Sequence, residues 1–175
     1  MDKFIGAVRL LSRIAGVVAA LLIALAVLVI CDMVIERYGL NLTTIWQIDV
    51  VTYSIVGATF IGSPYVLMHR GHVNVDILPM HSGPRFRFWL ALFTMGLSLA
   101  FCTVLFILVS RYWYEAYSGN WRSDTVWRAR MWIPLLSMPV GIGLLVLQYV
   151  AEILALVTGR TRPFGMSASP YEPVA

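Results

Sequence analysis

The sequence predicts an all-α integral membrane protein, with four transmembrane helices packed in one bundle. Composition is the first observation behind this fold class. Of the 175 residues, 59% are hydrophobic and only 13% are charged, whereas soluble domains usually carry about 25% charged residues. The second observation is a set of four apolar stretches, each near the roughly 20 residues that a helix needs to cross a hydrocarbon core of about 30 Å. These predicted spans are residues 15–35, 50–68, 88–109 and 133–157.

The N-terminal segment, residues 1–13, is predicted to form an amphipathic helix lying in the membrane interface. At about 100° per residue, Phe4, Ala7, Val8 and Leu11 share one face, and polar side chains gather on the other. The alternative is a frayed, basic start to the first span. That span is too long for a secretory leader and no small-residue cleavage site follows it, so we expect it to be retained.

Prolines and polar residues predict how the later elements begin, bend and end. Thr43 or Thr44 could cap the second span. Pro64 should kink the second span and Pro139 should bend the fourth, because an interior proline removes one helical hydrogen bond. The tail, residues 160–175, contains three prolines and is predicted to be flexible. Since the spans use most of the length, we expect residues 1–175 to form one membrane domain.

Aromatic side chains cluster after the third span and along the loop that follows it. Aromatic rings of this kind prefer the headgroup level of a bilayer, so this loop is predicted to lie along the membrane surface. The predicted interfacial anchors are Trp113, Trp121, Trp127 and Trp132.

The distribution of basic residues predicts the orientation. An even number of spans puts both termini on one side, together with the middle loop. That side holds eight of the 13 basic residues, and the opposite side holds five, all arginines. The positive-inside rule therefore favours cytoplasmic termini. The net charge of +4 reflects these span ends and does not indicate nucleic-acid binding.

The composition of the spans argues against several function classes. No Asp, Glu, Lys or Arg lies in the middle of any span, although such groups usually mark ion paths and substrate sites. The three histidines fall in one loop and the two cysteines lie in different spans, so neither a cofactor nor a metal is expected. The sequence contains no recognisable pair of nucleophile and base, so an enzyme is not expected. A protein that supports another membrane protein fits these absences best.

Short motifs carry a family resemblance. Residues 70–78, Arg-Gly-His-Val-Asn-Val-Asp-Ile-Leu, resemble the loop signature of the small membrane subunit of tripartite ATP-independent periplasmic (TRAP) transporters, the DctQ-like family. Glu36-Arg37-Tyr38, the pair Trp46 and Asp49, and Pro139-Val140-Gly141 are similar to further elements of that family, with Asp49 where the family usually has Glu. The likeness covers roughly residues 10–158. The partner-interface candidates are Arg37, Trp46, Asp49, Arg70, His72, Asp76, Pro139 and Gly141.

The resemblance implies a scaffold subunit in the bacterial inner membrane. Such a subunit would hold a large TRAP membrane subunit, which carries the sodium and substrate sites, among membrane lipids. A periplasmic substrate-binding protein would deliver a carboxylate-bearing molecule, such as a C4-dicarboxylate or a sialic acid. The small subunit of a tripartite tricarboxylate transporter is an alternative, and so is the membrane anchor of a respiratory or redox enzyme.

Two interactions are expected in the loops. We expect Arg70, His72 and Asp76 to organise the cytoplasmic loop between the second and third spans, with a solvated loop that only fixes topology as the alternative. Arg37 and Asp49 could pair across the periplasmic turn, or Arg37 could contact lipid headgroups.

Overall fold

The computed structural model describes residues 2–69 and 84–158, and four of its helices are long and apolar enough to cross a membrane. This confirms the predicted fold class. No β-strand occurs in the described ranges. The elements in chain order are α1 (Asp2–Val34), the π-helical turn η1 (Ile35–Gly39), α2 (Gln47–Met68), α4 (Pro84–Ser118), α5 (Trp132–Leu135) and α6 (Ser137–Val157).

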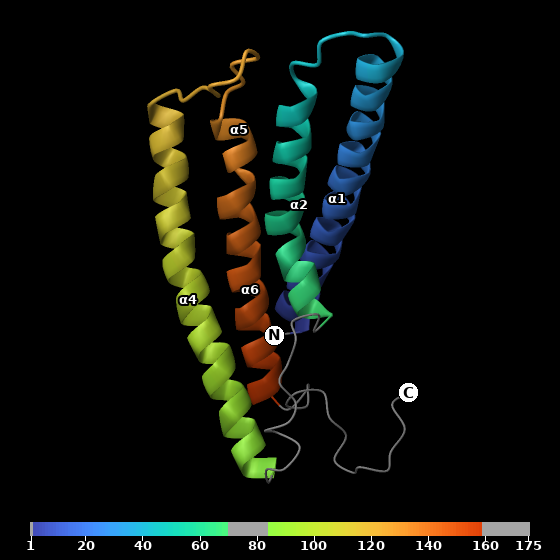
Figure 1. Cartoon of the computed structure of the whole chain (residues 1–175). Helices are drawn as coiled ribbons and strands as arrows, with labels where there is room; N and C mark the ends of the chain where they lie inside the picture. The colour runs from blue at the N-terminus through green and yellow to red at the C-terminus, as the bar shows by residue number, and fades with distance from the viewer. Residues whose placement is uncertain (1, 70–83, 159–175) are drawn as a thin grey trace.

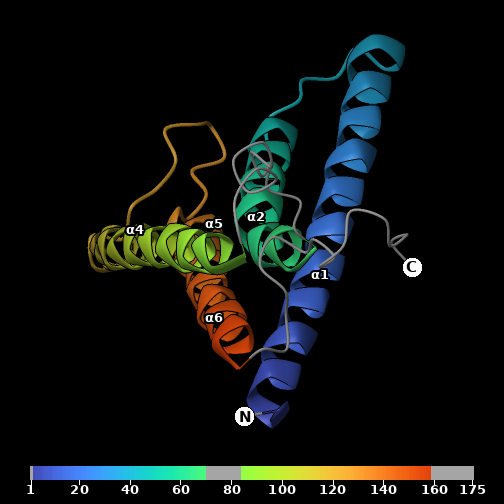
Figure 2. The ribbon, with the colours of Figure 1, turned by 90° about the horizontal axis from the view of Figure 1, so that it is seen from below.

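The four long helices form an open bundle with α2 and α6 at its centre. Figure 1 shows α4, α6, α2 and α1 side by side, and the view from below places α1 and α4 on opposite sides of the central pair (Figure 2). Helix α6 packs against all three of the others. The N-terminus lies at the same end as the last turns of α2 and α6, and η1 lies at the opposite end (Figure 1). For brevity, the end that carries η1 is called the distal end.

Helix α1 runs without a break from Asp2 to Val34, so the N-terminal segment and the first span form one rod. Its packed side places Ile5, Val8 and Ser12 three or four residues apart and buries all three. Phe4 and other apolar residues of the remaining surface stay exposed, as a lipid-facing side requires. The interfacial position of residues 1–13 remains a prediction.

Small residues bring α1 and α2 close together. A Cβ built on Gly16 would lie 2.5 Å from Cγ of Tyr65, and one on Gly62 would lie 3.1 Å from Cβ of Ala19. Both distances are too short for a side chain without a shift of the neighbour. Small residues at this seam therefore set the helix separation, as expected where packing rather than water drives helix association.

Two helix ends differ from the sequence prediction, and an interruption of the fourth span agrees with the bend predicted at Pro139. Neither Thr43 nor Thr44 caps α2, whose N-cap residue is Trp46 without a side-chain cap bond. Helix α4 continues to Ser118, beyond the apolar run and through polar and aromatic last turns. The fourth span is interrupted at Leu136, one turn before Pro139. The interruption falls where the ring of a proline crowds the preceding turn.

Candidate functional site

The segment between α4 and α5 folds into a compact hairpin at the distal end, which we call the 119–131 hairpin. Arg122 and Arg130 form an isolated antiparallel bridge. The backbone N–H of Ser123 donates to the carbonyl of Ala129 over 2.9 Å, and Met131 donates to Trp121 over 3.0 Å. The loop predicted to lie on the membrane surface therefore has defined internal structure.

Asp49 joins the 119–131 hairpin to the first turn of α2. The Thr125 hydroxyl donates to Oδ2 of Asp49 over 2.5 Å, and Thr125 is itself 2.9 Å from the hydroxyl of Ser123. Asp49 is only 7% exposed. A carboxylate at a helix N-terminus is also favoured by the helix dipole. The structure thus gives Asp49 a partner in the hairpin, and Arg37 is not its hydrogen-bond partner.

A second polar contact joins η1 to α2. The side-chain amide of Gln47 donates to Oε2 of Glu36 over 2.6 Å, and Gln47 is 1% exposed. Its Oε1 atom is buried and has no hydrogen-bond partner in the described residues. Arg37 and Trp46 flank this contact in the chain and both are exposed. Two of the predicted interface residues thus lie at the distal surface beside a fixed turn.

Aromatic rings hold both ends of the 119–131 hairpin. Tyr112 of α4 packs edge-to-face on Trp121 at a centroid distance of 5.6 Å. Tyr117 stacks on Trp113 and meets the edge of Trp132 at 5.7 Å. The indole N–H of Trp113 donates to the Trp132 carbonyl over 3.1 Å. Three of the four predicted anchor tryptophans therefore pack against the protein, while their position in the membrane interface stays a prediction.

Helices α2 and α6 approach each other closely at Gly141. A Cβ on this buried glycine would overlap the carbonyl of Phe60 and lie 2.9 Å from the backbone nitrogen of Ile61. Pro64 lacks the N–H that would normally bond to the Phe60 carbonyl. The Ser63 hydroxyl donates to that carbonyl instead, over 2.8 Å. The freed acceptor in α2 is thereby satisfied, and α6 can pack directly against it.

A buried polar chain links α1 to α6 towards the other end of the bundle. The hydroxyl of Ser12 donates to Oε1 of Gln148 over 2.8 Å, and Nε2 of Gln148 donates to Glu152 over 3.1 Å. Gln148 is fully buried. Neither Ser12 nor Gln148 is among the site residues predicted from the sequence. A polar side chain inside an apolar span was the available signal for this contact.

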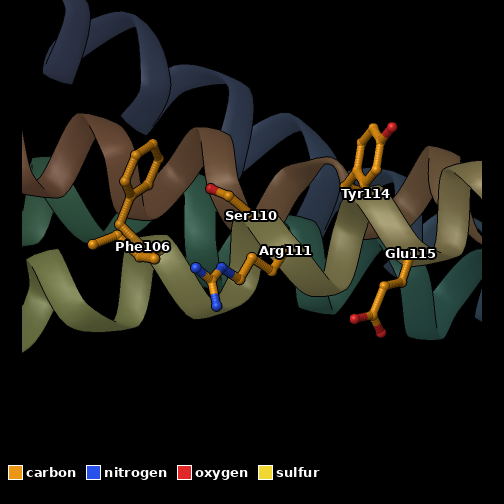
Figure 3. Close-up of a pocket in the computed structure, with 6 residues that line it drawn as sticks. Phe106, Ser110, Arg111, Tyr114 and Glu115 are labelled. Carbon is orange, nitrogen blue, oxygen red and sulfur yellow. The ribbon is translucent and has the colours of Figure 1, made fainter.

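Two surface depressions lie along α4. Figure 3 shows one of about 420 Å³, in which Phe106, Ser110 and Tyr114 rise from one side of the helix and Glu115 points away from them. All of its lining residues belong to α4. A depression built by a single helix has no opposing wall, so it lacks the convergent polar groups of a substrate pocket. Pro139 lines a neighbouring depression between α4 and α6.

The remaining predicted site residues belong to the loop between the second and third spans. Arg70, His72 and Asp76 lie outside the described residues. Within the described ranges, no group of three His, Cys, Asp or Glu side chains could hold a metal ion.

The fold and these contacts define a class of polytopic α-helical membrane protein whose polar groups fix helices and loops in place. Comparison with known proteins adds the family. Residues 26–159 match the family described as "Tripartite ATP-independent periplasmic transporters, DctQ component". The chain belongs to this family and is a DctQ-like small subunit of a TRAP transporter.

A curated relative agrees with the family assignment. The chain is 22% identical over 148 residues to the C4-dicarboxylate TRAP transporter small permease protein DctQ of Vibrio cholerae serotype O1. The match covers 73% of this chain and 64% of the relative, so the chain spans less than two thirds of that protein's length. No solved structure matches the chain.

Proposed function

We propose that this chain is the scaffold subunit of a TRAP transporter, which supports a large membrane subunit during uptake of an organic acid. The observation that carries the proposal is that buried polar side chains form hydrogen bonds within this chain. The buried polar side chains Gln47, Asp49 and Gln148 all bond to other residues of this chain. A protein that itself carried cargo would aim such groups into a path.

The outer helices supply the surface for a partner. Only 6% of the most apolar stretch of α4 is buried within this chain. Its exposed large apolar side chains include Phe93, Phe101 and Phe106. Lipid can cover such a face, and so can the helices of another membrane protein. The proposed partners are a large TRAP membrane subunit and a periplasmic substrate-binding protein, in agreement with the family assignment.

The proposed setting is the bacterial inner membrane, with both termini in the cytoplasm. Eight of the 13 basic residues then face the cytoplasm. The distal end, with η1 and the 119–131 hairpin, faces the periplasm. There it can meet the binding protein, with Arg37, Trp46 and Asp49 at or near this surface.

The cargo and the coupling ion are assigned to the other subunits. We propose a carboxylate-bearing molecule as the cargo, because the relative's name includes C4-dicarboxylate. We further propose that the large subunit couples its uptake to sodium. We also propose that Arg70, His72 and Asp76 organise the cytoplasmic loop, and that this chain has no catalytic activity.

Affinity purification of the full chain from its native membranes tests the scaffold role. The expected companion is a many-span membrane protein, and the reconstituted complex should take up organic acids only with the binding protein and an inward sodium gradient. A haem or flavin protein as the companion would favour the membrane-anchor alternative. Solute transport by the purified chain alone in liposomes would contradict the proposal.

A further inference from the structure

A groove runs from the 119–131 hairpin down between α2 and the α5–α6 helices. Its upper cavity has a volume of about 390 Å³, and its lower cavity has a volume of about 290 Å³. The two cavities share Tyr53, Ile133 and Pro134 as lining residues, so they meet at one level. None of the contacts assigned to the scaffold role occupies this groove.

The mouth of the groove is basic. Arg122, Arg128 and Arg130 line it, and all three side chains are exposed. Asp124 belongs to the hairpin and Asp49 bonds to its Thr125, but neither acidic residue lines the groove. Three guanidinium groups around one cavity offer several forked donors, the geometry that binds phosphate oxygens in pairs.

Two features of the 119–131 hairpin are energetically unfavourable: repulsion between arginines and a left-handed backbone conformation. The bridge places Arg122 opposite Arg130, and like charges in such a cross-strand pair repel each other. Arg128 has a φ angle of 49°, a left-handed conformation that is uncommon for residues other than glycine. An anion seated among the three side chains would reduce this repulsion.

Below the mouth the groove becomes apolar and enters the span region. Leu22, Val50 and Ile61 line the lower cavity together with Gly57, where an added Cβ would lie 3.2 Å from Cδ1 of Leu22. Gly57 lies ten residues into α2, which corresponds to a depth of about 15 Å. This arrangement suits an amphiphilic ligand. Its charged head would lie at the basic mouth, and its apolar chain would lie along the helices in the lower cavity.

We propose that this groove binds one anionic phospholipid, with the phosphate among Arg122, Arg128 and Arg130 and an acyl chain beside Gly57. The site accounts for an excess of arginine on the side of the membrane where the positive-inside rule predicts few basic residues. An acidic protein surface could neutralise the arginines, but it would leave the apolar slot empty. The inference does not depend on the transporter role of the complex.

Native mass spectrometry of the full chain, purified in detergent with its companion membrane proteins, tests the site. The probes are phosphatidylglycerol and phosphatidylcholine with identical acyl chains. Phosphatidylglycerol should bind more tightly. The Arg122→Gln, Arg128→Gln, Arg130→Gln triple variant should lose about a hundredfold in affinity for it, since each arginine contributes about fivefold and the three contributions multiply. Arg111→Gln is the matched control, because Arg111 is an exposed arginine near the same end but outside the groove, and its affinity should not change.

Three further outcomes would overturn the proposal. Equal affinity of the wild-type protein for both lipids would remove the headgroup selectivity. Displacement of phosphatidylglycerol by an equal concentration of glycerol 3-phosphate would show a site for small anions rather than for lipid. A triple variant that kept the lipid, with an unchanged unfolding midpoint, but no longer bound the periplasmic protein would assign the arginines to a protein interface.

Discussion

At the scale of single residues, the contact between Gly141 and the Phe60 carbonyl fixes how closely α2 and α6 pack. Gly141→Ala should destabilise the protein by about 2 kcal/mol, because overpacking a close contact typically costs about 1–3 kcal/mol. The neighbouring atoms belong to the backbone, so no side chain can move away to make room. The measurement is the thermal unfolding midpoint of the full chain in detergent.

Gly96 provides the matched control for this substitution. It lies in α4, and a Cβ built there meets nothing within 4 Å. Gly96→Ala should therefore leave stability unchanged or raise it by up to about 1 kcal/mol, the propensity difference between the two residues in a helix. Equal midpoints for the two variants would show that α2 and α6 are farther apart at Gly141 than described.

The Ser12–Gln148 bond is the second prediction at this scale. Ser12→Ala would leave the buried Oε1 of Gln148 without its donor. A double-mutant cycle with Gln148→Leu should give a coupling energy of about 0.6 kcal/mol, the average for side-chain hydrogen bonds between membrane helices. Additive effects of the two substitutions on unfolding would mean that α1 and α6 do not bond through this pair.

At the scale of elements, the link between Asp49 and Thr125 decides whether the 119–131 hairpin is fixed to α2. Thr125→Val keeps the side-chain shape but removes the donor to a buried carboxylate. Loss of a hydrogen bond to a charged group costs about 1.5–3 kcal/mol, so the hairpin amides should exchange hydrogen at least about tenfold faster. Exchange mass spectrometry of Ser123, Arg128 and Met131 measures this, because their N–H groups bond inside the hairpin.

Thr103→Val controls for the loss of a threonine hydroxyl. Thr103 is exposed on α4, and its hydroxyl donates to the Leu99 carbonyl of the same helix. Its replacement should leave exchange in the hairpin unchanged. If Thr125→Val behaved in the same way, the aromatic contacts alone would hold the hairpin in place.

The elements could be predicted from the sequence because lipid imposes length and composition on every span. The contacts between elements could not. Asp49 and Thr125 are 76 positions apart, and Ser12 and Gln148 are 136 apart, so their meeting depends on helix tilt and on the fold of a loop. Gly141 was identified by resemblance only. Its physical role becomes clear once the Phe60 carbonyl of another helix lies against it.

At the scale of the whole molecule, the open bundle supports the proposed scaffold role. Helix α6 packs on three neighbours, whereas α4 rests mainly on α6 and on the short α5. Within the described residues, the outer surface of α4 is therefore exposed, while α6 contacts each of the other three long helices. A static unit with a broad apolar side can hold a larger membrane protein in place without moving itself.

Orientation is the whole-molecule property that can be measured most directly. In a variant without Cys31 and Cys102, a single cysteine replaces either Val126, which is 83% exposed in the 119–131 hairpin, or Arg9 at the opposite end. A membrane-impermeant maleimide should label Val126→Cys in intact cells and label Arg9→Cys only after the inner membrane is opened. The reverse pattern would place the hairpin in the cytoplasm. It would also move the arginine-lined groove to the inner leaflet, because the groove and the hairpin lie at the same end of the helices.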